Sequence, residues 1–410
     1  MIYSRFIEGK ILEALQESPI ILLTGARQTG KTTLAKHLAK SKNWRAQYVT
    51  LDDLTIKGAA LSDPHGFINN LSLPVVIDEI QLVPELLSPI KLCIDQNRKP
   101  GQFLLTGSAN VLMLPQISES LAGRIELFTL HSLSQGELSH KKEDFIDQIF
   151  SGTLKKSTPL SRMTVWEKVT NGGYPEVIHR SRYERKQIWF RDYITTILQR
   201  DIRELAQING LSNMPRILEL LAVRVGSLHN AAEISRALQI PQTSIKRYTS
   251  LFEATYLANR ILPWSSNLGK RLVKTPKFYF YDVGLAAHLS GQTPETLSKK
   301  SLLSGPLLEN FVLGELQKQA TWSQHTPRIY HYRTQSGIEL DFLLELRNGD
   351  CFGVEVKAAS TVRPEDFKGC RWLQDQLGDK FLAGIVFYLG EKVVSFGKSL
   401  WALPISSMWS

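Results

Sequence analysis

Cysteine is scarce in this chain, and its three copies, Cys93, Cys351 and Cys370, stand far apart. Because none of them belongs to a C-x-x-C pair, the sequence indicates neither a zinc site nor a disulfide framework. Long apolar runs are missing too: no stretch approaches the roughly 18 residues that a membrane-spanning helix needs, and the first residues lack the apolar core of a signal peptide. Low-complexity tracts and internal repeats are also absent. We therefore expect a cytoplasmic protein with reduced thiols and no membrane contact.

Negative charge is in deficit. The chain has 49 Lys and Arg against 39 Asp and Glu, a formal net charge of +10 (49 − 39). Such an excess favours anionic partners, nucleic acid first, although a merely basic cytosolic protein has the same balance. The 410 residues, 43% of them hydrophobic and 21% charged, are ordinary for a globular protein but too many for one typical core. We expect two or three domains.

The clearest motif is GARQTGKTT, which follows the apolar run Ile20 to Leu23 and matches G-x-x-x-x-G-K-[ST] without departure. A strand before it and a helix after it, near 31–40, favour a phosphate-binding loop over a glycine turn that merely has this spelling. The glycines let backbone N–H groups face inward, and the helix N-terminus favours anions. Lys31 supplies charge for the β- and γ-phosphates, and the Thr32 hydroxyl suits Mg²⁺. The predicted ATP-binding residues are Gly25, Ala26, Arg27, Gln28, Thr29, Gly30, Lys31, Thr32 and Thr33.

A second strand, in LPVVIDEIQ, provides carboxylates for such a site. Its β-branched run ends in Asp78 and Glu79. We expect Asp78 to hold Mg²⁺, directly or through water, and Glu79 to polarise the water that attacks the γ-phosphate. A hydrophobic strand that ends in D-E is a weak signal alone, and the complete P-loop before it makes it strong.

A third strand, in QFLLTGSAN, places polar residues at its carboxyl end, where ligands of open α/β sheets lie. We predict that Ser108, or else Thr106, senses the γ-phosphate or orients water. Asn110 follows on the same segment. The alternative is a strand-end turn that uses Gly107.

Two further features near this domain are ambiguous. AQYVTLDDL predicts a strand that ends in Asp52 and Asp53, which are either site residues or a helix cap. Arg124, after a small-residue turn, could reach a γ-phosphate in its own subunit or a neighbour's, or be a plain surface arginine.

Four segments in this order and spacing, GARQTGKTTLAK, VVIDEIQLVPELL, FLLTGSAN and SLAGR, resemble the AAA+-type ATPases of bacteria and archaea. The second half is similar to the C-terminal domain of unknown function 4143 that accompanies them, through GGYPEVI, WFRDYITTILQRDI, KTPKFYFYDVGL, GPLLENFVLGEL and GIELDFLLE. These segments cover nearly the whole chain, and the P-loop and IDEIQ are the most specific. The resemblance implies an ATP-binding protein and ATPase whose cellular roles are poorly defined across the family.

The middle of the chain has helix-turn-helix spacing. A helix near 231–238, the turn QIPQ and a second helix from Gln242 precede two apolar strands, near 256–262 and 278–281. The basic loop SSNLGKRLVKTPK between the strands makes the segment resemble a winged helix, and the loop includes Lys277. We expect this loop to contact phosphates, unless the fold serves packing only.

A second candidate site lies in GIELDFLLELRNGDCFGVEVKAA, whose alternation predicts half-buried strands. Glu355 follows Asp341 by fourteen positions (355 − 341), and with Lys357 this D…E-x-K order resembles the core of restriction-endonuclease-type nucleases. The resemblance implies that the carboxylates hold a divalent metal ion, with Glu309 as a third, and that the lysine stabilises charge on the attacked phosphate. Two alternatives stay open: E-V-K forms a surface salt bridge on an edge strand, or the fold is an inactive binding module.

We therefore predict an α/β protein in four parts. They are a P-loop ATPase domain of AAA+ type (1–155), a helical region (156–220), a winged helix-turn-helix (221–290) and a restriction-endonuclease-like α/β domain (291–410). The predicted function is ATP binding and Mg²⁺-dependent hydrolysis, coupled to DNA or partner binding by the C-terminal half, with self-association as a further expectation. The alternatives are an ATP-gated, metal-dependent DNA nuclease and a nucleotide-dependent switch in a protein assembly without nucleic acid.

Overall fold

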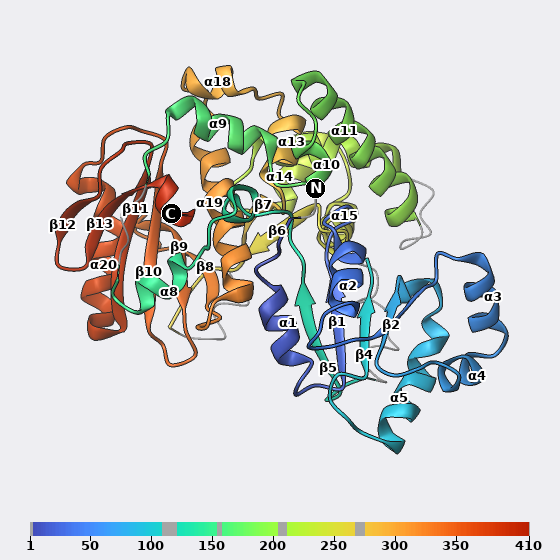
Figure 1. Cartoon of the computed structure of the whole chain (residues 1–410). Coiled ribbons are helices and arrows are strands. Elements are labelled where there is room, and N and C mark those ends of the chain that lie inside the picture. Colours follow the sequence, from blue (N-terminus) through green and yellow to red (C-terminus); the bar gives the residue numbers. More distant parts are fainter. Residues whose placement is uncertain (1–2, 109–120, 154–157, 204–210, 267–274, 410) are drawn as a thin grey trace. The chain divides into compact units, whose positions relative to one another are not determined.

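The computed structural model describes residues 3–108, 121–153, 158–203, 211–266 and 275–409 (Figure 1). The chain divides into two compact units. Unit 1 consists of Met1–Leu133 and Ala254–Tyr256, and unit 2 consists of Ser134–Glu253 and Leu257–Ser410. Within the described ranges, no helix combines the length and the apolar character that crossing a membrane requires.

Unit 1 is built on a five-stranded parallel sheet with the strand order β2-β3-β4-β1-β5. Its strands are β1 (Ile20–Thr24), β2 (Gln47–Thr50), β3 (Val75–Asp78), β4 (Phe103–Thr106) and β5 (Ile125–Thr129). Its helices include α1 (Glu8–Ala14), α2 (Lys31–Ala39), α3 (Leu54–Ser62), α4 (Pro64–Asn69) and α5 (Leu87–Gln96). Because the strands are parallel, their carboxyl ends meet at one edge, which brings the loop after β1 to the ends of β3 and β4.

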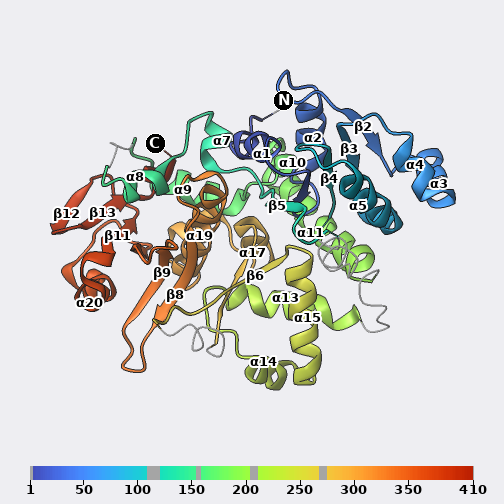
Figure 2. The ribbon, with the colours of Figure 1, turned by 90° about the horizontal axis from the view of Figure 1, so that it is seen from below.

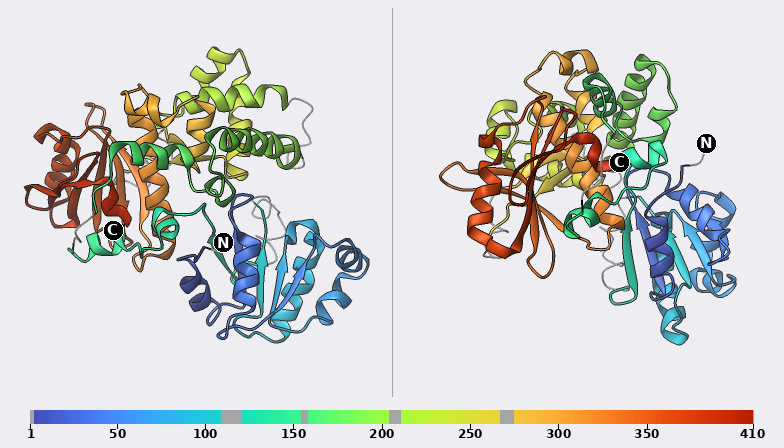
Figure 3. Two further views of the ribbon diagram at one scale, coloured as in Figure 1. Left: turned by 45° about the horizontal axis from the view of Figure 1, so that its top comes forward. Right: turned by 60° about the vertical axis from the view of Figure 1, so that its left-hand side comes forward.

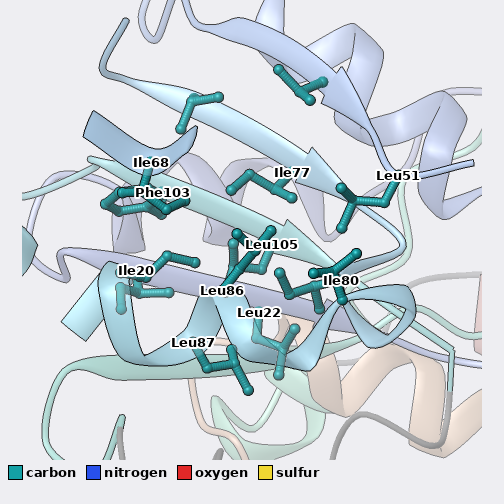
Figure 4. Packing of buried hydrophobic residues seen from close by; sticks show 14 of the residues in the cluster. Ile20, Leu22, Leu51, Ile68, Ile77, Ile80, Leu86, Leu87, Phe103 and Leu105 are labelled. Carbon is teal, nitrogen blue, oxygen red and sulfur yellow. The ribbon is translucent and has the colours of Figure 1, made fainter. Parts of the chain in front are cut away.

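Helices cover both faces of this sheet, because its side chains alternate between the faces. Ile21 and Leu23 of β1 pack with α1 and α2. Figure 3 shows helices on both sides of this sheet. Ile20 and Leu22 point to the other face and pack with α3, α4 and α5 (Figure 4). All five residues of β1 are buried, as expected for a central parallel strand whose sequence is a continuous apolar run.

The strands predicted in this half are confirmed at β1, β2, β3 and β4, and the predicted helix after the P-loop is α2. The carboxylate of Asp53 accepts hydrogen bonds from the backbone N–H groups of Thr55 and Ile56 at the start of α3. For Asp53, the helix-cap alternative is therefore the one that the structure confirms.

Unit 2 contains a six-stranded mixed sheet with the strand order β12-β13-β11-β10-β9-β8. Its strands are β8 (Arg328–Arg333), β9 (Glu339–Glu345), β10 (Cys351–Lys357), β11 (Phe381–Tyr388), β12 (Val394–Gly397) and β13 (Leu400–Pro404). The helices α19 (Ser304–Trp322) and α20 (Lys368–Leu377) lie on opposite sides of this sheet (Figure 2). Since β10 pairs with β9 on one side and β11 on the other, E-V-K does not stand on an edge strand, contrary to that alternative.

Helices make up most of the rest of unit 2. They include α7 (Gln135–Ser139), α8 (Phe145–Phe150), α9 (Arg162–Asn171), α10 (Pro175–Ile178), α11 (Tyr183–Thr196), α13 (Met214–Val223), α17 (Val283–Leu289) and α18 (Pro294–Ser298). The predicted helix pair is found as α14 (Ala231–Leu238) and α15 (Gln242–Ala254), followed by an antiparallel pair, β6 (Ala258–Ile261) and β7 (Lys277–Phe280).

The basic loop between β6 and β7 corrects one expectation. Lys270, Arg271 and Lys274 of this loop lie outside the described residues. Lys277, which we expected to contact phosphates with them, is buried at 8% exposure and forms ion pairs with Glu309 and Asp341. Its ammonium is therefore held inside unit 2 and does not belong to a phosphate-contacting surface.

Candidate nucleotide site and a carboxylate cluster

The P-loop has the backbone that its glycines allow. Gly25 has φ +142°, and a Cβ there would lie 2.3 Å from the carbonyl oxygen of Leu130, so only glycine fits at this turn. Gln28 and Gly30 are also left-handed, with φ values of 64° and 95°. This sequence of turns carries the chain from the carboxyl end of β1 into the first turn of α2.

The side chain of Lys31 lies inside this loop. Its ammonium donates to the carbonyl oxygens of Gly25 at 3.0 Å and Ala26 at 2.8 Å, and the residue is only 6% exposed. α2 begins directly at Lys31 with no side-chain cap, so the loop combines a cation with the positive end of a helix. Both features favour a phosphate group.

Asp78, at the end of β3, is the centre of a hydroxyl cluster. Thr32 Oγ1 donates to its Oδ2 at 2.9 Å and Tyr48 Oη donates to the same oxygen at 2.7 Å. Thr106 Oγ1 donates to Oδ1. Burial, followed by the hydrogen bond to Asp78, raises the pKa of Tyr48, so its phenol stays protonated as a donor. The Thr32 hydroxyl and the Asp78 carboxylate are adjacent hard oxygen donors, and they fit Mg²⁺.

Glu79 follows in a left-handed conformation, with φ 59°. Its backbone N–H donates to Thr106 Oγ1 at 3.2 Å, and its carboxylate accepts a hydrogen bond from the side-chain amide of Gln81. The turn and these two contacts orient a half-buried carboxylate beside Asp78. This is the position in which a base for an attacking water is expected.

The other two predicted catalytic residues lie differently. Ser108 is buried after β4, and its Oγ has no hydrogen-bond partner within the described ranges. Arg124 directly precedes β5, at the amino end of the sheet, and its Nε donates to Asp95 at 2.6 Å. β5 separates it from the P-loop edge by five residues, roughly 16 Å at 3.3 Å per residue. The structure does not bring Arg124 to the P-loop of its own chain, and a role in a neighbouring subunit stays a prediction.

Three site residues were missed by sequence reasoning. Arg5 donates to the backbone carbonyls of Thr29 at 2.8 Å and His131 at 2.7 Å, and so ties the P-loop to the segment after β5. Tyr48 and Gln81 orient the two carboxylates. Only the pairing of β2 with β3 places Tyr48 beside Asp78, and no local pattern reports that register.

In unit 2, the four predicted nuclease-like residues lie near one another, and Lys277 and Tyr279 lie with them. Lys277 Nζ is 2.8 Å from Glu309 Oε1 and 3.4 Å from Asp341 Oδ1, and Tyr279 Oη donates to Glu309 Oε1. Lys357 Nζ donates to Glu355 Oε1 at 2.8 Å. Lys357 and Glu355 thus form an ion pair, but it is not the surface pair on an edge strand of the E-V-K alternative, because β10 is an inner strand and the Glu355 side chain is 15% exposed.

The two glutamates of this cluster, Glu309 and Glu355, have pKa values above that of an ordinary glutamate. Burial, and after it the charge of Asp341, raise the pKa of Glu309 to about 7 and the pKa of Glu355 to about 8. For Lys277, burial alone would lower the pKa, but the Glu309 and Asp341 carboxylates outweigh it and raise the pKa above that of an ordinary lysine. The Lys277 ammonium therefore stays charged.

Comparisons with known families match three parts of the chain. A family model described as an AAA domain matches residues 17–139. Two models for domains of unknown function match residues 163–296 (DUF8612) and 304–408 (DUF4143). Over nearly its whole length, at 98% of this chain and 84% of the relative, the chain is 31% identical to an uncharacterized protein of Mycobacterium tuberculosis. An uncharacterized protein of Mycobacterium bovis matches with the same identity and coverage.

The chain belongs to the same family as these two mycobacterial proteins. Its N-terminal part is an AAA-type P-loop NTPase domain, and its C-terminal part is the domain of unknown function 4143. Among solved structures, AMPPCP-bound DnaA from Aquifex aeolicus is 17% identical, with a TM-score of 0.30 over 60% of this chain and 86% of that one. The RuvB branch migration motor of Thermotoga maritima is 16% identical, with a TM-score of 0.30 over 63% and 90%. Both TM-scores are low, so neither likeness supports a conclusion about function.

Proposed function

We propose that the AAA domain binds ATP and hydrolyses it with Mg²⁺. One observation carries the proposal: the Thr32 hydroxyl contacts the Asp78 carboxylate at 2.9 Å, directly beside a lysine-bearing P-loop. Within a P-loop NTPase domain, this contact unites the two oxygen donors that Mg²⁺ requires with the cradle for the phosphates.

Each side chain has a distinct part in this reaction. The Lys31 ammonium moves from the carbonyls of its own loop to the phosphate oxygens, where it offsets their charge. Thr32 and Asp78 hold Mg²⁺, which neutralises charge on the phosphates when it is bound. The Glu79 carboxylate accepts a proton from the attacking water, and the hydroxyls of Thr106 or Ser108 orient that water or the γ-phosphate.

The test is the isosteric change Glu79→Gln. It should retain ATP, because the clamp is intact, but lower turnover by about 10² to 10⁴-fold, because the amide cannot accept the proton. Calorimetry with Mg²⁺–ATP and steady-state phosphate release measure the two quantities. Glu85→Gln, an exposed change on the same segment, is the matched control and should behave as wild type. Turnover near wild type in Glu79→Gln would assign the base to another residue, and ATP uptake that Lys31→Ala does not weaken would overturn the proposal itself.

A second proposal is that the C-terminal half couples this reaction to DNA. The helix pair α14 and α15 followed by the pair β6 and β7 supports it, as do the exposed side chains of Thr243, Lys246 and Arg247 near the start of α15. We expect binding of duplex DNA whose affinity falls with salt by about one log–log unit per phosphate contact.

Fluorescence anisotropy with labelled DNA at several salt concentrations measures this slope. Replacing Lys246 and Arg247 with glutamine should lower both the affinity and the slope. The matched control replaces Lys392 and Lys398 with glutamine; both are also exposed and they flank β12. If no DNA binds even at low salt, the nucleotide-dependent switch in a protein assembly becomes the better proposal.

A further inference from the structure

The carboxylate cluster of unit 2 already contains a cation of the chain. Glu309 comes from α19, Asp341 from β9 and Glu355 from β10, and the first two share the ammonium of Lys277 from β7. Lys277 is 8% exposed. A buried ammonium is costly unless carboxylates pair with it, so this residue and the two carboxylates need one another.

Both oxygens of Asp341 and one oxygen of Glu309 already face hydrogen-bond donors of the chain. Asp341 Oδ1 faces Lys277, and its Oδ2 accepts the backbone N–H of Val356 at 2.9 Å. Glu309 Oε1 accepts from both Lys277 and Tyr279. A divalent ion takes carboxylate oxygens at about 2.0–2.6 Å and repels an ammonium at the same place. Of the described histidines, cysteines and carboxylates, no group of three or more is arranged to hold a metal ion.

The nuclease resemblance implies a metal ion on these carboxylates, and the side chains present do not fit one. Lys357, the lysine of the E-x-K pattern, pairs with Glu355 and is a third exposed. Lys277 is a second lysine from outside that pattern, and it lies between the two other carboxylates. Lys277 thus pairs with Glu309 and Asp341, and Lys357 pairs with Glu355.

We propose that Lys277 is the resident cation of this centre and that its ammonium excludes divalent metal ions from Glu309 and Asp341. The centre then ties β7 to α19 and β9 by charge and supports no metal-dependent cleavage of DNA. This inference does not depend on the proposed ATPase activity.

The test measures Mn²⁺ binding to the full chain without nucleotide, by the loss of the paramagnetic resonance signal of free Mn²⁺. All chains carry Asp78→Asn, so that the Mg²⁺ site proposed in unit 1 contributes nothing. This background should bind no Mn²⁺ that depends on Asp341. Adding Lys277→Met should create one bound Mn²⁺ per chain at concentrations up to roughly 1 mM, the range of weak protein sites. Adding Asp341→Asn to that variant should remove the ion again.

Lys277→Arg is the matched control, because it keeps a cation at the position and should gain no Mn²⁺. Thermal melting shows whether each variant is folded. A folded Lys277→Met variant that gains no Mn²⁺ overturns the idea that the ammonium excludes the metal. If Lys277→Met does not fold, the Asp78→Asn chain is compared with the same chain carrying Asp341→Asn. A Mn²⁺ ion that the Asp78→Asn chain binds and the Asp341→Asn variant loses overturns the proposal, and equal Mn²⁺ binding by the two supports it.

Discussion

Thr106 offers the sharpest test of how the nucleotide site is organised. Its hydroxyl is fully buried, donates to Asp78 Oδ1 and accepts the backbone N–H of Glu79 at 3.2 Å. A single oxygen therefore connects the proposed Mg²⁺ ligand to the proposed base. Thr106→Val keeps the shape of the side chain and removes both hydrogen bonds.

The structure sets the expected size of the effect. A hydrogen bond to a charged group contributes about 1.5–3 kcal/mol. If Asp78 and Glu79 need this hydroxyl in the transition state, the same amount is lost from its stabilisation, and 1.4 kcal/mol corresponds to about tenfold in rate. We therefore expect the kcat for ATP to fall by about ten- to hundredfold. ATP affinity should change less, because the hydrogen bonds of the Thr106 hydroxyl go to Asp78 and Glu79 and not to the P-loop.

Steady-state phosphate release over a range of Mg²⁺–ATP concentrations gives kcat and KM for the wild type, Thr106→Val and Thr106→Ser. The serine variant keeps the hydroxyl and should retain most of the activity. Because the valine variant also loses stability, melting curves must show that it is folded at the assay temperature. A folded valine variant with wild-type kcat would refute the reasoning and leave Ser108, which follows β4, as the remaining predicted residue of this segment.

Three further predictions test other parts of the structure. Gly172→Ala would place a Cβ 1.9 Å from Asp282 Oδ1, so the free energy of unfolding should fall by about 3 kcal/mol. Gly291→Ala is the control, because Gly291 has a similar φ but open space around it. Equal denaturation midpoints for the two variants would contradict the clash. His229 has its pKa lowered to about 4, by burial and then by a nearby arginine. As pH falls, His229 is protonated in the unfolded chain at a higher pH than in the folded chain, so the free energy of unfolding falls by at most about 3 kcal/mol between pH 6.5 and pH 4. Melting curves of His229→Gln should show a weaker pH dependence than wild type, and an equal pH dependence would argue against this role of His229. Arg5→Met removes the hydrogen bonds to the backbone carbonyls of Thr29 in the P-loop and His131 after β5. The KM for ATP should therefore rise about tenfold with a smaller change in kcat, and Arg5→Lys should have a smaller effect; an unchanged KM in Arg5→Met would deny Arg5 this role.

The nucleotide site was predictable where its chemistry is local. The spacing of Gly25, Gly30 and Lys31 demands a particular turn between strand and helix, and the structure has it. Asp78 and Glu79 were found because a buried strand that ends in two carboxylates has few other uses after a P-loop. Tyr48 and Arg5 could not be found this way, since their partners are 30 and 24 residues distant and lie on other elements.

In the carboxylate cluster of unit 2, partners distant in the sequence were even harder to predict. The D…E-x-K order predicted strands that the structure has at β9 and β10, and the nuclease resemblance implied a metal ion beside their carboxylates, but neither pointed to the lysine that lies there. Lys277 looked like one more basic residue of an exposed loop, and it is paired with carboxylates 32 and 64 residues away. Sequence alone specifies which chemical groups the chain contains and which short backbone turns it makes, because these depend on neighbouring residues. Which cation meets which carboxylate was decided by strand pairing and helix packing, since only the folded chain brings such distant groups within hydrogen-bond range.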